Sequence, residues 1–189
     1  MMHSGSGIGQ LIRLFCLVAT LSFAAGSVHA DDYAPVNQLL RDGQLSEAMT
    51  KAEQYLAKNP RDPQMRFLKG LIQQDGGQRD AAIQTYTSLI EEYPELPEPY
   101  NNLAVVRAAQ GKLDQARIAL EDAIRAVPGY PVAHENLGDI HAQLAARSYR
   151  NAQKLDPTNK TVAPKLKLVS EVTDRVSPEP PRAPAPTRR

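Results

Sequence analysis

The sequence contains a single cysteine, Cys16, and that residue lies in an apolar run near the start of the chain. The first thirty residues have the pattern of a secretory signal, with Arg13, no acidic residue, and an apolar run from Leu14 to Ala25. We expect cleavage after Ala30. The mature chain would then have no cysteine, which excludes a disulfide framework and thiol chemistry.

The sequence also lacks an apolar run long enough to cross a bilayer. The run in the leader has about 12 residues, whereas a spanning helix needs roughly 20. We therefore expect no stable membrane anchor after the signal is removed. The lipid-attachment alternative is disfavoured because Leu14 and Phe15, rather than small residues, precede Cys16.

The mature chain has no net charge, but its charge is unevenly distributed. Residues 31–146 contain 11 basic and 17 acidic side chains, and residues 147–189 contain 10 basic and 4 acidic ones. Nucleic-acid affinity comes mainly from Lys and Arg that neutralise phosphates. The acidic body therefore argues against a nucleic-acid partner.

Motifs for catalysis are missing as well. The sequence has no Gly-x-Ser-x-Gly elbow, and the turn at Asp75 lacks the Lys and Ser or Thr of a phosphate loop. The stretch HENLGDIH places His134 and His141 seven residues apart, about 10.5 Å along a helix, which is too far to share one zinc ion. We expect no enzyme activity, no cofactor and no metal.

The sequence does contain an internal repeat of 34 residues. Residues of three types recur at that period: Gly43, Gly77 and Gly111; Ala48, Ala82 and Ala116; Pro60, Pro94 and Pro128. Gly permits the positive φ that ends a helix, a small Ala allows close helix approach, and Pro stops a helix. Between these markers the apolar residues recur at helical spacing. This predicts an all-α stack of helix pairs, each covering its neighbour.

The repeat resembles the tetratricopeptide repeat, with its pattern W-x2-L-G-x2-Y, then A-x3-F, then P. The third unit, 97–130, matches best, through Tyr100, Leu103, Ala104, Ala116 and Leu120. In the second unit, 63–96, three polar residues stand at positions that are usually apolar: Arg66, Lys69 and Gln73. The first unit, 31–62, is degenerate, and we expect its opening helix to begin near Pro35.

The fourth unit, 131–159, is shortened. Ala145 follows Ala116 by 29 residues instead of 34, so the five residues of the turn are missing. We therefore predict one continuous helix from about Val132 to Leu155. In this register His134 and His141 occupy the aromatic positions, where we expect them to be packed or half-buried, and Gly138 occupies the close-packing position.

Two segments follow the fourth unit. Residues 160–176 are expected to contain an amphipathic capping helix, from about Thr161 to Val176, in which Pro164 is tolerated in the first turn. Residues 177–189 are rich in proline and are expected to form an extended, solvated tail.

The resemblance implies that peptides or partner proteins bind a concave face lined by the first helix of each pair. Matching by register places these residues on that face: Asn37, Arg41, Phe67, Leu71, Gln74, Asn101, Val105, Ala108, Glu135, Asp139 and Gln143. The implied groove is apolar in the middle and acidic at one end, which favours an apolar or basic ligand. The leading hypothesis is a non-catalytic periplasmic adaptor that helps to assemble an envelope complex. The alternative is an oligomeric structural protein that self-associates through the long fourth helix or the basic C-terminal end.

Overall fold

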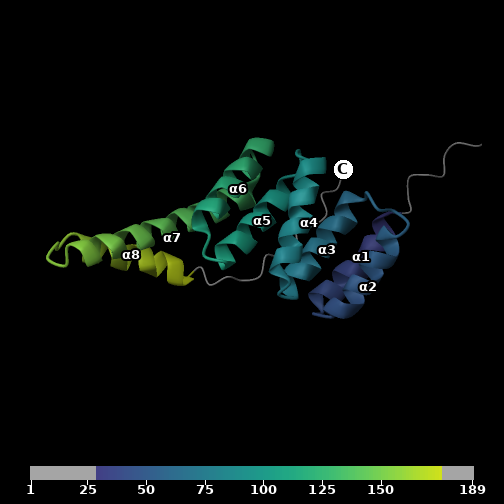
Figure 1. The fold of residues 1–189 in the computed structure, drawn as a ribbon, viewed down its shortest axis with the longest axis horizontal. Coiled ribbons are helices and arrows are strands. Elements are labelled where there is room, and N and C mark those ends of the chain that lie inside the picture. The colour runs from purple at the N-terminus through teal and green to yellow at the C-terminus, as the bar shows by residue number, and fades with distance from the viewer. Residues whose placement is uncertain (1–28, 176–189) are drawn as a thin grey trace, which may run out of the picture.

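A computed structural model describes residues 29–175, which form eight helices and no strand. The helices are α1 (His29–Arg41), α2 (Leu45–Leu56), α3 (Pro63–Asp75), α4 (Arg79–Glu92), α5 (Pro97–Ala109), α6 (Leu113–Ala126), α7 (Pro131–Leu155) and α8 (Val162–Arg175). Consecutive helices pack side by side into an elongated stack (Figure 1). The predicted all-α repeat solenoid is confirmed. The expected tail at 177–189 and nearly all of the expected signal lie outside the described residues.

The glycine of each repeat ends the first helix of a pair. Gly43, Gly77 and Gly111 have φ values of 72°, 73° and 73°, which L side chains rarely adopt. At the first of these turns the N–H of Gln44 donates to the carbonyl of Leu39 over 2.8 Å, which satisfies an otherwise free helix-end oxygen. The predicted role of these glycines is therefore confirmed.

Small residues allow the two helices of a pair to approach closely. Ala48, Ala82 and Ala116 are completely buried. Gly70 lies against the ring of Tyr86, and a Cβ atom added at Gly70 would lie 2.5 Å from Tyr86 Cε1. This contact between a small residue of the first helix and an aromatic residue of the second is central to the packing of the second repeat.

Two of the three polar residues of the second repeat, Arg66 and Gln73, have polar partners on the returning helix. The Arg66 guanidinium donates to both carboxylate oxygens of Glu92 over 2.8 Å and also to the Ser88 hydroxyl. The Thr85 hydroxyl donates to Gln73 Oε1 over 2.7 Å. The α3–α4 pair therefore replaces some apolar packing with paired polar groups, which avoids the cost of burying them alone.

The opening helix begins earlier than we expected, at His29 rather than near Pro35, which lies inside α1. Proline costs this helix one backbone hydrogen bond. Contacts of the preceding turn offset that loss: the Tyr33 hydroxyl donates to Asp62 over 2.6 Å, and its ring centroid lies 5.8 Å from that of Tyr55. These tertiary contacts thus favour a helix that begins before its proline.

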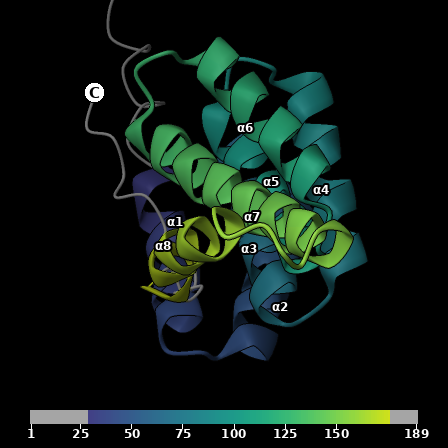
Figure 2. The same cartoon turned by 90° about the vertical axis from the view of Figure 1, so that its left-hand side faces the viewer.

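The long fourth-repeat helix is present as predicted. α7 runs unbroken for 25 residues, about 37 Å at ~1.5 Å per residue. Its outer part extends beyond the stack, and α8 folds back along it (Figures 1 and 2). Pro164 lies in the first turn of α8, as predicted. Between residues 29 and 175, no helix combines the length and apolarity needed to span a membrane.

Candidate binding surfaces

The structure distributes the predicted concave-face residues over three degrees of exposure. Arg41 and Glu135 are exposed. Those that are half-buried are Asn37, Gln74, Val105, Ala108, Asp139 and Gln143. The three that are buried are Phe67, Leu71 and Asn101.

The buried residues pack inside the stack. Phe67 and Leu71 belong to the main hydrophobic cluster, and the Phe67 ring centroid lies 6.0 Å from that of Tyr86. Asn101 accepts a hydrogen bond of 2.8 Å from Asn136, which joins α5 to α7. These three side chains therefore offer a ligand little surface, and the concave face is narrower than expected. Large residues at these positions are used in packing between repeats.

The predicted concave-face residues on α3, α5 and α7 include side chains that stay partly exposed. Gln74 Oε1 accepts a hydrogen bond of 3.2 Å from the buried Tyr86 hydroxyl, which fixes the amide at the end of α3. Val105 and Ala108 supply an apolar strip on α5. Such a surface suits an extended or helical segment with apolar side chains.

The α7 end of this surface is acidic. Glu135 and Asp139 are one helical turn apart, and neither forms an ion pair with another described residue. Partial burial raises the pKa of Asp139, and the charge of Glu135 raises it further. A cationic group placed here would relieve this unfavourable concentration of negative charge.

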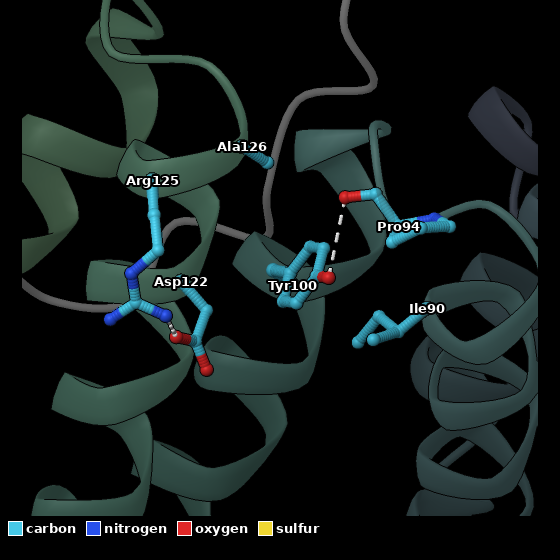
Figure 3. A pocket seen from close by; sticks show the side chains of 6 residues that line it. All are labelled: Ile90, Pro94, Tyr100, Asp122, Arg125 and Ala126. Atoms are coloured by element: carbon cyan, nitrogen blue, oxygen red, sulfur yellow. Dashed lines mark hydrogen bonds and ion pairs between the residues drawn. The ribbon is translucent and has the colours of Figure 1, made fainter.

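A separate hollow of about 420 Å³ lies between the end of α4, α5 and α6 (Figure 3). Its lining residues are Ile90, Pro94, Tyr100, Asp122, Arg125 and Ala126. The Tyr100 hydroxyl donates to the carbonyl of Pro94 over 3.3 Å, and Asp122 pairs with Arg125 at the rim. None of the predicted concave residues lines it. The lining contains no cysteine, serine or histidine that could serve as a nucleophile or base.

The face of α7 that contains the two histidines is open to solvent, contrary to our expectation of packed positions. His134, Gly138 and His141 are all exposed, and a Cβ atom added at Gly138 would have no neighbour within 4 Å. In the second repeat the equivalent glycine, Gly70, is covered by Tyr86 of the returning helix. Because α7 continues without a turn, no returning helix covers this face. The missing turn was predicted from the sequence, but the exposure of this face of α7 was not.

The surroundings of the two histidines differ from those of a clustered ligand set. His134 Nε2 lies 2.9 Å from the carbonyl oxygen of Pro128, so the ring is engaged by backbone. Among the described residues, no group of three or more His, Cys, Asp or Glu side chains is placed to hold a metal ion.

Comparison with known proteins agrees with the register and the helix pairs. A family model described as tetratricopeptide repeat matches residues 33–97, 72–131 and 101–160. The chain is a member of the tetratricopeptide repeat family. Tetratricopeptide repeat proteins are generally non-catalytic scaffolds for protein interactions.

Individual relatives are distant. The chloroplastic tetratricopeptide repeat domain-containing protein PYG7 of Arabidopsis thaliana is 23% identical over 167 residues, which cover 84% of this chain and 56% of that protein. The chain thus spans about half the length of this curated relative.

Solved tetratricopeptide repeat structures share the fold. The thermophilic protein TTC0263 of Thermus thermophilus aligns with a TM-score of 0.58 and 24% identity, covering 77% of this chain and 83% of that one. The first repeat domain of Spaghetti (RPAP3), bound to an HSP90 peptide, aligns with a TM-score of 0.55 and 17% identity, covering 61% and 92%.

Proposed function

We propose that this tetratricopeptide repeat protein is a non-catalytic scaffold that binds an apolar or basic segment of a partner protein on its concave face. The observation that carries the proposal is the combination of an apolar strip at Val105 and Ala108 with an unneutralised acidic pair, Glu135 and Asp139. Structural relatives solved with bound peptides support a peptide ligand.

The proposal places the protein in the bacterial periplasm, where it would assist envelope assembly. Its support is the leader pattern of residues 1–30 and the absence of cysteine from residues 31–189. Fusing residues 1–30 to a phosphatase that is active only after export tests this part. An inactive fusion, or a mature protein that does not begin at Asp31, would count against it.

The binding face is tested with a double variant, Gln74→Arg with Val105→Arg. Both side chains are partly exposed, but Gln74→Arg also removes the acceptor of the Tyr86 hydroxyl, so its folding has to be checked in particular. The matched control is Ile118→Arg, which adds one charge at an apolar residue of α6 that is 50% exposed. Circular dichroism would verify that all variants fold.

The assay measures affinity for an array of immobilised peptides that are apolar and basic, apolar and neutral, or apolar and acidic. We expect wild type and control to prefer the basic class, and the double variant to bind it at least about tenfold more weakly, equivalent to ~1.4 kcal/mol. Equal binding by wild type and the double variant, or a preference for acidic peptides, would refute the proposed concave site.

A further inference from the structure

The uncovered face of α7 is a packing surface that the fold leaves without its usual neighbour. In the second repeat, the corresponding positions are covered by α4, with Gly70 against Tyr86. On α7 the same register gives His134, Gly138 and His141, all exposed. The open segment, Pro131–His141, is about 16 Å long at ~1.5 Å per residue. It is long enough to accept a short helix, and the missing side chain of Gly138 leaves a notch at its centre, the glycine notch.

The α8 helix has a second apolar stripe that residues 29–175 leave exposed. Its inner stripe packs on α7 and consists of Val162, Leu166 and Val169. The outer stripe consists of Leu168, 65% exposed, and Val172, 50% exposed, which are one helical turn apart. A helix of 14 residues with apolar stripes on two sides is suited to lie between two neighbours.

The hairpin geometry keeps α8 away from the open face of its own chain. α8 returns antiparallel to α7 from the loop at 156–161 and extends for about 21 Å. It therefore lies along the outer half of α7, where Ala146 is buried, and stops before His141. The open face and the outer stripe cannot meet within one molecule, but they can meet between two.

We propose that two copies of the chain associate through a reciprocal contact, in which the outer stripe of α8 in each copy packs on the open face of α7 in the other. The two α7 helices then run antiparallel about a two-fold axis. Each contact is made twice, as a self-complementary interface requires. The α8 of the second copy replaces the returning helix that the fourth repeat lacks.

The two surfaces match in a simple register. α8 of the second copy runs parallel to α7, so placing Leu168 opposite Gly138 lets the leucine enter the glycine notch. The same register brings Val172 beside His141 and Lys167 within reach of Glu135. Neither Lys167 nor Glu135 has an ion-pair partner among residues 29–175.

The charge distribution favours a second copy over an anionic membrane surface. The body, residues 31–146, has six more acidic than basic side chains, whereas residues 147–189 have six more basic than acidic ones. The opposite net charges of these two parts of the chain favour association between copies. An anionic lipid surface is less well matched, because Glu171 and Asp174 nearly balance the three basic residues of α8 and leave this helix without a concentrated positive charge.

Sedimentation velocity over a concentration series tests the proposal on the full mature chain. We expect a dimer in wild type and in the Ile118→Glu control. Leu168→Glu and Gly138→Trp should each raise the dissociation constant by at least about 100-fold, because two copies of the apolar contact are lost per dimer. The monomer should tolerate Gly138→Trp, since nothing lies within 4 Å of a Cβ there.

Charge reversal adds a test that misfolding cannot imitate. Lys167→Glu and Glu135→Lys should each weaken dimers about five- to 30-fold, and the combined variant should recover most of that loss. A wild type that stays monomeric up to about 1 mM, or dimers indifferent to Leu168→Glu, would overturn the proposal. Loss of binding to phosphatidylglycerol vesicles by Leu168→Glu, without any dimer, would assign the stripe to lipid instead. Glu135 belongs to both surfaces, so the concave variants at Gln74 and Val105 are the ones that separate this contact from the scaffold site, and they should leave dimerisation unchanged.

Discussion

Two glycines at the same repeat position should respond in opposite ways to a single methyl group. At Gly70 a Cβ atom would lie 2.5 Å from Tyr86 Cε1, and the Tyr86 ring is completely buried and packed against Phe67. At Gly138 a Cβ atom would meet nothing within 4 Å. Gly70→Ala therefore adds a clash to a packed core, whereas Gly138→Ala changes only the backbone.

The magnitudes follow from two competing effects. Replacing Gly by Ala inside a helix stabilises it by about 0.5–1 kcal/mol, because the unfolded backbone loses freedom. Overpacking a core costs about 1–3 kcal/mol. We expect Gly138→Ala to raise the melting temperature by about 1–4 °C, using ~2–4 °C per kcal/mol for a chain of this size. We expect Gly70→Ala to lower it, by up to about 10 °C, because the overpacking cost exceeds the gain in helix propensity.

The assay is thermal unfolding followed by circular dichroism at 222 nm, in dilute solution so that association does not contribute. Equal helix content before heating is the control for both variants. If Gly138→Ala were destabilising, something would have to pack on that face of α7 within the monomer, and the account of the missing helix would be wrong. If Gly70→Ala were stabilising, the Tyr86 contact would not be as close as described.

Two further predictions concern polar contacts of the first two repeats. Asp62→Ala should destabilise the protein by about 2–3 kcal/mol in urea unfolding, because Asp62 caps Met65 N–H at 2.7 Å and accepts from the Tyr33 and Tyr55 hydroxyls; Asp62→Asn should recover part of the loss. Arg66 lowers the pKa of Glu92 below its usual 4.5 through their hydrogen bonds, so this pair stabilises the fold above that pH and the contribution is lost as pH falls through the lowered pKa. Stability measured between pH 6 and pH 3 should fall less in Arg66→Met than in wild type, and an unchanged slope would exclude the pair as a cause.

The repeat architecture was predictable because its signals are local. Gly43, Gly77 and Gly111 need a positive φ, and Pro60, Pro94 and Pro128 stop helices, whatever their surroundings. The unbroken α7 followed from counting residues. The positions of these helix ends depend on the backbone properties of glycine and proline, which can be read from a single sequence.

The exposed part of the concave face was harder to predict because burial depends on neighbours from other repeats. Phe67 and Leu71 have the register of groove residues, yet they pack into the main cluster. A register assigns a side chain to a helix face, but it does not say how far the next helix covers that face. The predicted burial of His134 and His141 was wrong for the reverse reason, because the helix that covers such positions in the other repeats is missing here.

The missing turn connects these observations. Removing five residues from the fourth repeat keeps its first and second helices in line, so neither can bury the face intended for the other. The middle of α7 is instead held by the Arg147–Asp114 ion pair to α6 at 2.8 Å, and its outer half by α8. These contacts stabilise the long helix but leave Gly138 open. The face of α7 around Gly138 keeps the residue pattern that packs against a second helix, but in this repeat the second helix continues outward as the end of α7. In the other repeats this face is buried within the molecule. Here it can be buried only by another molecule.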